Sequence, residues 1–143
     1  MLKKLLSPNL ILKNWMVIIR VIIGIIIAKY GLEVFSRDKM KGNADWLTDI
    51  HFPAPVFMAY VGKATELVGG IFLAAGLVTR LASTALVVTM TIIIFFMGKG
   101  NIWGDEQLPF LLLLFFVNFI FCGAGKWSLD YLLFNREKQT QKQ

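Results

Sequence analysis

LASTALVVTMTIIIFFMG, residues 81–98, is an uncharged run of 18 residues, and QLPFLLLLFFVNFIFCGAG, residues 107–125, is a second such run of 19. An apolar helix needs about 18 or more residues of this kind to cross a bilayer. A backbone inside lipid must satisfy its own hydrogen bonds, which favours the α-helix. The two runs therefore indicate an integral membrane protein with helical spans.

Two longer apolar blocks precede these runs, and both contain charged residues. Residues 15–35 include Arg20, Lys29 and Glu33, and residues 55–79 include Lys63 and Glu66. Each block could form a helix of about 30 Å at 1.5 Å per residue. The sequence therefore predicts an all-α, integral membrane four-helix bundle with helices at about 15–35, 56–78, 82–98 and 107–124.

The distribution of basic residues predicts the orientation of this bundle. Residues 1–134 are expected to form a single transmembrane domain, followed by a polar tail at 135–143. Lys and Arg are frequent near both termini and at Arg80, whereas acidic residues dilute them in the segments 36–55 and 99–106. Basic loops mark the cytoplasmic side. We therefore expect a multi-pass protein of the cell membrane, with N- and C-termini cytoplasmic and 36–55 as an outer loop.

The composition excludes several classes of protein. Hydrophobic residues make up 57% and charged residues 17%, against about 45–50% and 25% in soluble domains. With one cysteine, Cys122, and one histidine, His51, the chain has no ligand set for haem, zinc or an iron–sulfur cluster, so no metal is expected. The net charge of +6 reflects basic residues beside apolar blocks and predicts contact with a lipid bilayer, not with nucleic acid.

Small residues in the second predicted helix surround a carboxyl group. Gly62, Gly69 and Gly76 are spaced by seven and would form one stripe, which Gly70 widens. Small residues let helices approach closely in lipid. Glu66 follows Gly62 by four residues and precedes Gly69 by three, so it is expected to face a neighbouring helix.

The first predicted helix offers two cations to Glu66. Arg20 shares a helix face with Gly24 and Gly31, but it lies about 10 Å shallower in the membrane than Glu66. Lys29 lies at the depth of Glu66, but about 100° around the helix from the face of Arg20. A charge at mid-bilayer costs about 2.5–3.5 kcal/mol. We interpret Glu66 and Arg20 as sharing a water-accessible pocket. Its outer mouth would be lined by Lys29, Tyr30 or Glu33. In the alternative, Lys29 and Glu33 simply pair with each other near the surface.

Two further polar groups lie in the outer segments. Glu106 begins the last predicted helix, where acidic residues complement the helix dipole; alternatively, it completes an outer site with the loop that contains His51. A lone loop histidine is more often structural, although histidine is the side chain that changes charge near neutral pH. The candidate catalytic residues are therefore Glu66 and Arg20, and the candidate substrate-binding residues are Lys29, Tyr30, Glu106 and His51.

The segment AYVGKATELVGGIFLAAGLVTRLAS, residues 59–83, resembles the central signature of the DoxX family of small bacterial membrane proteins. Further likenesses flank it. They are Arg20-x3-Gly24 with Gly31, Pro53-x-Pro55, Glu106, and the closing Gly123-Ala-Gly125-x-x-Ser128-Leu129-Asp130. The resemblance implies a four-helix membrane protein with oxidoreductase activity, because related proteins are described as subunits of a thiosulfate–quinone oxidoreductase. One departure is Tyr30-Gly31, where the family often has His-Gly; a phenol is a poor proton carrier near neutral pH.

Two hypotheses of function follow. In the first, the protein is a membrane oxidoreductase or a subunit of one, linked to the quinone pool or to sulfur or quinone detoxification, and acts with a soluble redox partner. Glu66 would exchange protons, and Arg20 would bind an anionic group or keep Glu66 ionised. In the alternative, the protein is a non-catalytic scaffold that recruits redox or detoxification enzymes, or a small-solute transporter. The glycine stripe suits contacts within one chain or between two, so a homo-oligomer is a candidate assembly.

Overall fold

The structure is a computed structural model that describes residues 8–98, 100, 102–123 and 128–130, with side chains from residue 15 onward. Regular structure in these ranges is helical throughout. Three helical segments are long and apolar enough to cross a membrane, at Trp15–Phe35, Pro55–Ala75 and Thr79–Met97, and a shorter apolar helix spans Gln107–Cys122. These segments confirm the predicted all-α membrane class.

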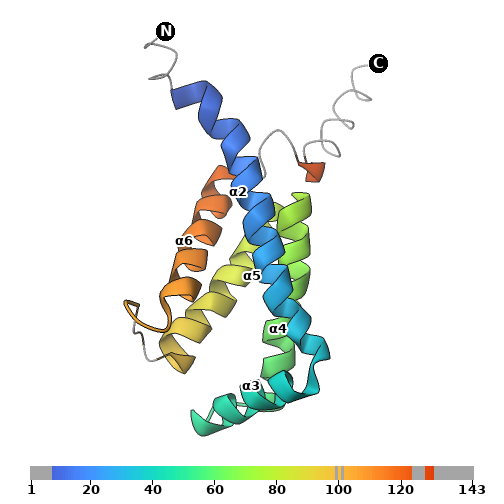
Figure 1. The fold of residues 1–143 in the computed structure, drawn as a ribbon, viewed down its shortest axis with the longest axis vertical. Helices are drawn as coiled ribbons and strands as arrows, with labels where there is room; N and C mark the ends of the chain where they lie inside the picture. The colour runs from blue at the N-terminus through green and yellow to red at the C-terminus, as the bar shows by residue number, and fades with distance from the viewer. Residues whose placement is uncertain (1–7, 99, 101, 124–127, 131–143) are drawn as a thin grey trace.

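The helices form a bundle whose long axes run roughly along one direction (Figure 1). Helix α2 spans Pro8–Gly31 and continues as a 3₁₀ turn, η1, at Leu32–Phe35. Helix α4 spans Pro55–Ala75, and α5 spans Thr79–Ile92 before it continues as a π-helical stretch, η2, at Ile93–Met97. Helix α6 spans Gln107–Cys122. The first helix thus begins before the expected residue 15, and the predicted tail at 135–143 lies outside the described residues.

The segment 36–55, expected as an outer loop, contains a helix. Helix α3, Arg37–Asp49, lies across the end of the bundle opposite the Pro8 end of α2 and the Cys122 end of α6 (Figure 1). Its apolar residues Met40, Ala44 and Leu47 recur every three or four positions and pack with Ala59 of α4. The prediction missed α3 because this short apolar face lies within a mostly polar stretch.

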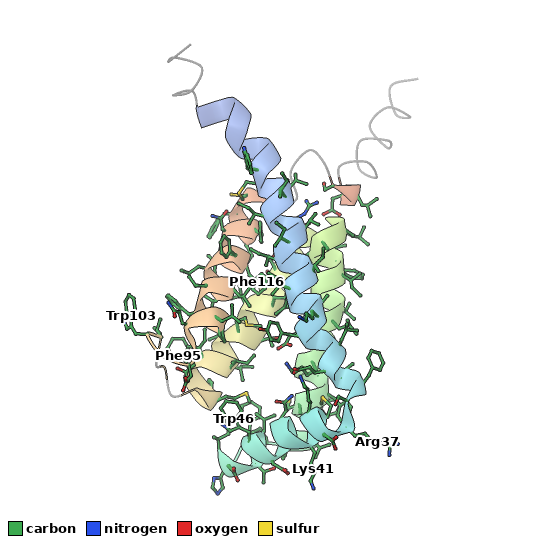
Figure 2. The ribbon with its side chains drawn as sticks, in the orientation of Figure 1. Arg37, Lys41, Trp46, Phe95, Trp103 and Phe116 are labelled. Carbon is green, nitrogen blue, oxygen red and sulfur yellow. The ribbon has the colours of Figure 1, made fainter. Side chains whose placement is uncertain are left out.

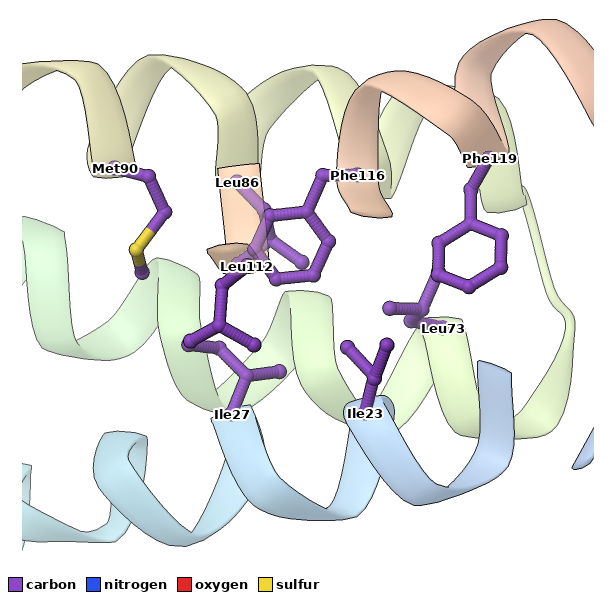
Figure 3. Packing of buried hydrophobic residues seen from close by; sticks show 8 residues of the cluster. All are labelled: Ile23, Ile27, Leu73, Leu86, Met90, Leu112, Phe116 and Phe119. Carbon is purple, nitrogen blue, oxygen red and sulfur yellow. The ribbon is translucent and has the colours of Figure 1, made fainter. Parts of the chain in front are cut away.

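The main core lies between the four long helices (Figure 3). Each of these helices contributes side chains with almost no exposed surface, and α6 contributes the largest ones. The residues are Ile23, Ile27, Leu73, Leu86, Met90, Leu112, Phe116 and Phe119. This core therefore occupies the middle of the bundle. The apolar cluster between α3 and α4 is separate from it.

Glycines set the register of α2 against α4. A Cβ atom at Gly24 would lie 2.6 Å from the backbone nitrogen of Ala74, and one at Gly31 would overlap the backbone of Leu67. A Cβ at Gly70 would meet the backbone of α2 at 2.6 Å. The two backbones therefore touch, as small residues allow in membrane helices. This register places residue 20 beyond Ala74, and it places residues 32–35 near the turn of α4 that contains Glu66.

The expected glycine stripe of α4 is not one interface. A Cβ at Gly69 would lie 3.0 Å from Cγ of Leu86 on α5, whereas a Cβ at Gly62 would have no neighbour within 4 Å. Gly76 ends α4 with a φ of +70°. A straight α-helix drifts by about 20° per seven residues, so positions spaced by seven turn away from one partner. Gly70, not this stripe, gives the close contact with α2.

Candidate functional site

The buried carboxyl group of Glu66 is paired within its own helix. Glu66 is 2% exposed, and the Nζ of Lys63 donates a hydrogen bond of 2.9 Å to its Oε2. The two residues are three positions apart, so they lie on neighbouring turns of α4. Pairing with an opposite charge lowers the cost of keeping both groups inside the bundle.

Two further charged residues extend this ion pair toward the end of the bundle that α3 covers. Lys63 Nζ also lies 3.1 Å from Oε2 of Glu33 in η1, and Lys39 of α3 donates a hydrogen bond of 2.5 Å to Glu33 Oε1. We call Lys39, Glu33, Lys63 and Glu66 the charged chain. Glu33 therefore pairs with Lys63 and Lys39, and not with Lys29 as one sequence interpretation supposed.

A cavity of about 450 Å³ lies beside the buried pair, between α3, α4 and the α5–η2 helix. Lys63 and Glu66 line it on α4, and Trp46 and Phe52 contribute aromatic rings. Figure 2 shows Trp46 on the inner side of α3, facing the bundle, whereas Arg37 and Lys41 point away from it. Most of the wall is apolar, so polar groups are confined to a few positions, as in typical ligand sites.

The amide of Asn43 is one of these polar positions. Asn43 lines the cavity from α3, and its Nδ2 is buried without a hydrogen-bond partner among the described residues. A buried donor without a partner costs about 1–3 kcal/mol. A ligand in this cavity that carries an acceptor would satisfy it.

A second, smaller cavity of about 160 Å³ also borders the pair, between α2, α4, α5 and α6. Tyr30 of α2 contributes to its wall, and so do Lys63 and Glu66. Both residues of the ion pair therefore line both cavities.

Arg20 lies elsewhere, which corrects the interpretation that it shares a pocket with Glu66. Arg20 is buried, but a Cβ at Gly76 would lie 2.6 Å from its Nη2. Gly76 is the C-cap of α4, about 15 Å along the helix axis from Glu66. The glycine contacts of α2 set this register, and they place Arg20 even farther from Glu66 than the offset of about 10 Å expected from the sequence.

Asp130 organises the region around Arg20. Its carboxylate accepts hydrogen bonds from the backbone N–H groups of Val78, at 2.7 Å, and Thr79, at 3.2 Å, where α5 begins. Val78 has a φ of 47°, which a β-branched residue rarely adopts. The charge of Asp130 also acts on Arg20. We therefore interpret Arg20 and Asp130 as stabilising the turn between α4 and α5.

The other predicted substrate-binding residues are dispersed. Tyr30 borders the smaller cavity, but Lys29 is exposed and lines neither cavity. His51 is exposed in the turn after α3 with a φ of 56°. Glu106 packs against Gly98 near the start of α6, and its Oε2 has no partner among the described residues.

Sequence reasoning missed Lys63, Asn43 and Lys39 as members of the site. The spacing of Lys63 and Glu66 was a usable signal, because residues three apart on a helix are neighbours. Asn43 and Lys39 could not be found, since the helix that carries them was not predicted. Asp130 appeared only within a motif, and nothing in the sequence showed that it would cap α5.

The fold and the site together define a multi-pass helical membrane protein that encloses an ion pair beside an apolar cavity. The chain belongs to the DoxX family, whose sequence model matches residues 15–99.

Three known proteins are similar to this chain. The chain is 34% identical to "Putative oxidoreductase CatD" of Bacillus subtilis over 122 residues, which cover 85% of this chain and 88% of that protein. It is 29% identical to an uncharacterized membrane protein of Mycobacterium tuberculosis, over 82% of this chain and 80% of the relative. An uncharacterized protein of Haemophilus influenzae is 38% identical over 55% of this chain and 64% of its own length. No solved structure was found to match.

Proposed function

We propose that this protein is a membrane oxidoreductase component that binds a quinone in the 450 Å³ cavity beside Lys63 and Glu66. The observation that carries the proposal is the buried Lys63–Glu66 pair in the wall of an otherwise mostly apolar cavity. The relative whose name contains "oxidoreductase" supports a redox role. A role in sulfur or quinone detoxification would be one setting for this chemistry.

The chemistry of a quinone fits the wall of the cavity. A quinone ring is flat and apolar and carries two carbonyl oxygens that accept hydrogen bonds. The ammonium group of Lys63 has three N–H donors, and its two carboxylate partners, Glu33 and Glu66, leave one for a ligand. Trp46 and Phe52 offer ring surfaces, and the buried amide of Asn43 offers a second donor.

Glu66 and Lys63 would handle protons in the reaction. Reduction of a quinone to a hydroquinone consumes two electrons and two protons, and the reverse reaction releases them. In this proposal a soluble redox partner supplies or accepts the electrons. Glu66 and Lys63 give protons to the carbonyl oxygens or take them away, which is general acid–base catalysis.

Two glycine substitutions provide a test of binding at this cavity. Gly62 lines the cavity, and a Cβ there meets nothing within 4 Å, so Gly62→Leu should fill space without disturbing the helix. Gly42→Leu is the matched control, because Gly42 on α3 is equally open and lies outside the cavity wall.

The binding measurement is a titration of purified protein with a short-chain benzoquinone, followed by quenching of tryptophan fluorescence. We expect at least a tenfold loss of affinity in Gly62→Leu and unchanged affinity in Gly42→Leu. Equal affinity in both variants would exclude this cavity as the quinone site.

A second measurement tests the role of Glu66 in turnover. Glu66→Gln keeps the shape of the side chain but removes the group that exchanges a proton. We expect quinone to bind, while quinone reduction, followed by absorbance with the native electron donor, falls by about 10²–10⁴-fold. Unchanged turnover would remove Glu66 from the mechanism.

A further inference from the structure

The charged chain runs from the surface into the bundle with steadily decreasing exposure. The side chains of Lys39, Glu33, Lys63 and Glu66 are 60%, 23%, 16% and 3% exposed. Their charges alternate, and the successive N–O distances are 2.5, 3.1 and 2.9 Å. All three contacts are within hydrogen-bond distance. The charged chain therefore connects the buried carboxyl group of Glu66 to the exposed Lys39 at the α3 end of the bundle through three successive contacts.

We propose that Glu33 and Lys63 form the route by which Glu66 exchanges protons with the solution at the α3 end of the bundle. Glu33 is the entry point, because it is partly exposed and contacts both Lys39 and Lys63. The inference rests on the proposed function, in which Glu66 must be reset after each turnover. It adds that the protons of the reaction are exchanged on one side of the membrane.

The proposed transfer balances in protons and moves no electrons. Lys63 passes a proton from its ammonium group to the Glu66 carboxylate and becomes a neutral amine. Glu33, which has taken a proton from water, returns one to Lys63 and becomes a carboxylate again. The net result is one proton moved from the solution to Glu66, and the reverse sequence releases it.

The ionisable groups near Glu66 lie toward the α3 end of the bundle. Among the described residues that line the two cavities, the ionisable ones are Lys63, Glu66 and Tyr30. Helix α5 presents Thr89 and apolar side chains, and α6 presents Leu108, Pro109 and Leu112. Arg20 and Asp130 lie near the far end of α4. The charged neighbours of Glu66 therefore lead to η1 and α3.

The route can be tested without any quinone. Purified protein in lipid nanodiscs is subjected to a rapid change of pH, and infrared absorption of the protonated carboxyl group is followed in time. The Glu66 band is identified by its loss in Glu66→Gln. We expect Glu33→Gln to slow the protonation of Glu66 by at least tenfold. Asp49→Asn, an exposed carboxyl on α3 outside the charged chain, is the matched control and should leave the rate unchanged.

The outcomes separate this inference from the proposed function. An unchanged rate in Glu33→Gln, or a Glu66 carboxyl that never takes up a proton, would overturn the route. If Glu33→Gln does not fold, Glu33→Asp replaces it, since the shorter side chain withdraws the carboxylate from Lys63 and should slow protonation by a similar factor. A slowed rate in a protein that binds no quinone would support the route and refute the quinone proposal.

Discussion

Lys63 and Arg20 show how two cations inside one bundle acquire different roles. Lys63 contacts the carboxylates of Glu66 and Glu33 and borders both cavities. Arg20 is just as buried as Glu66, but it packs against Gly76 near the turn that Asp130 caps. We therefore assign Lys63 to the site and Arg20 to the stability of the opposite end.

Removing the Lys63 charge should be costly. Lys63→Met would leave the Glu66 carboxylate buried without its cation, and breaking such a pair costs about 3–5 kcal/mol. Lys39→Met removes a mostly exposed partner of Glu33, which is worth about 0–1 kcal/mol. Chemical unfolding in detergent should show this contrast. Equal losses of unfolding free energy in the two variants would mean that Lys63 does not stabilise a buried charge.

The helices differ in how well the sequence predicts them. Uncharged or nearly uncharged blocks of membrane length indicated the long helices, because lipid requires long apolar segments. The register between α2 and α4 could not be predicted, since it depends on which glycines let the backbones touch. The partner of Glu66 was within reach of sequence reasoning, because Lys63 lies three residues away on the same helix. The distance between Arg20 and Glu66 was not, because it depends on that register.

Substitution by alanine should have opposite effects on stability at two glycines, because only one of them lies where α2 and α4 touch. A Cβ in Gly31→Ala would overlap the backbone of Leu67, and overpacking costs about 1–3 kcal/mol. Gly62→Ala has open space and should gain up to about 1 kcal/mol from helix propensity. Thermal unfolding in detergent compares the two variants. A stable Gly31→Ala protein would contradict the observed register.

The start of α5 should depend on the carboxylate of Asp130. Asp130→Ala removes the acceptor for two backbone N–H groups, and loss of such a cap costs about 0.5–2 kcal/mol. Asp130→Asn keeps one carbonyl acceptor and should lose less. Unfolding free energies of the two variants provide the comparison, and equal losses would show that the negative charge, not capping, dominates.

The two ends of the bundle are chemically different. The α3 end carries the charged chain and the larger cavity. The opposite end brings together the Pro8 end of α2, the turn from α4 to α5, and Asp130 (Figure 1). The basic-residue distribution predicts that this second end faces the cytoplasm. Catalysis would then exchange its protons on the outer side.

Cysteine labelling tests that orientation, because the chain has a single cysteine, Cys122. In a Cys122→Ser background, Lys41→Cys places a thiol on the exposed face of α3, and Leu129→Cys places one at the opposite end. A membrane-impermeant maleimide applied to intact cells should label the first variant and reach the second only after permeabilisation. The reverse pattern would invert the topology.

We infer that Lys63, and not Arg20, stabilises the buried carboxyl group of Glu66, and a pair of double-mutant cycles can distinguish the two cations. Unfolding free energies are measured for Lys63→Met and Glu66→Gln, singly and combined, and likewise for Arg20→Gln and Glu66→Gln. We predict a coupling energy of about 1–3 kcal/mol for the Lys63 cycle and less than about 0.5 kcal/mol for the Arg20 cycle. Strong coupling to Arg20 with none to Lys63 would show that Arg20 is the cation that stabilises Glu66.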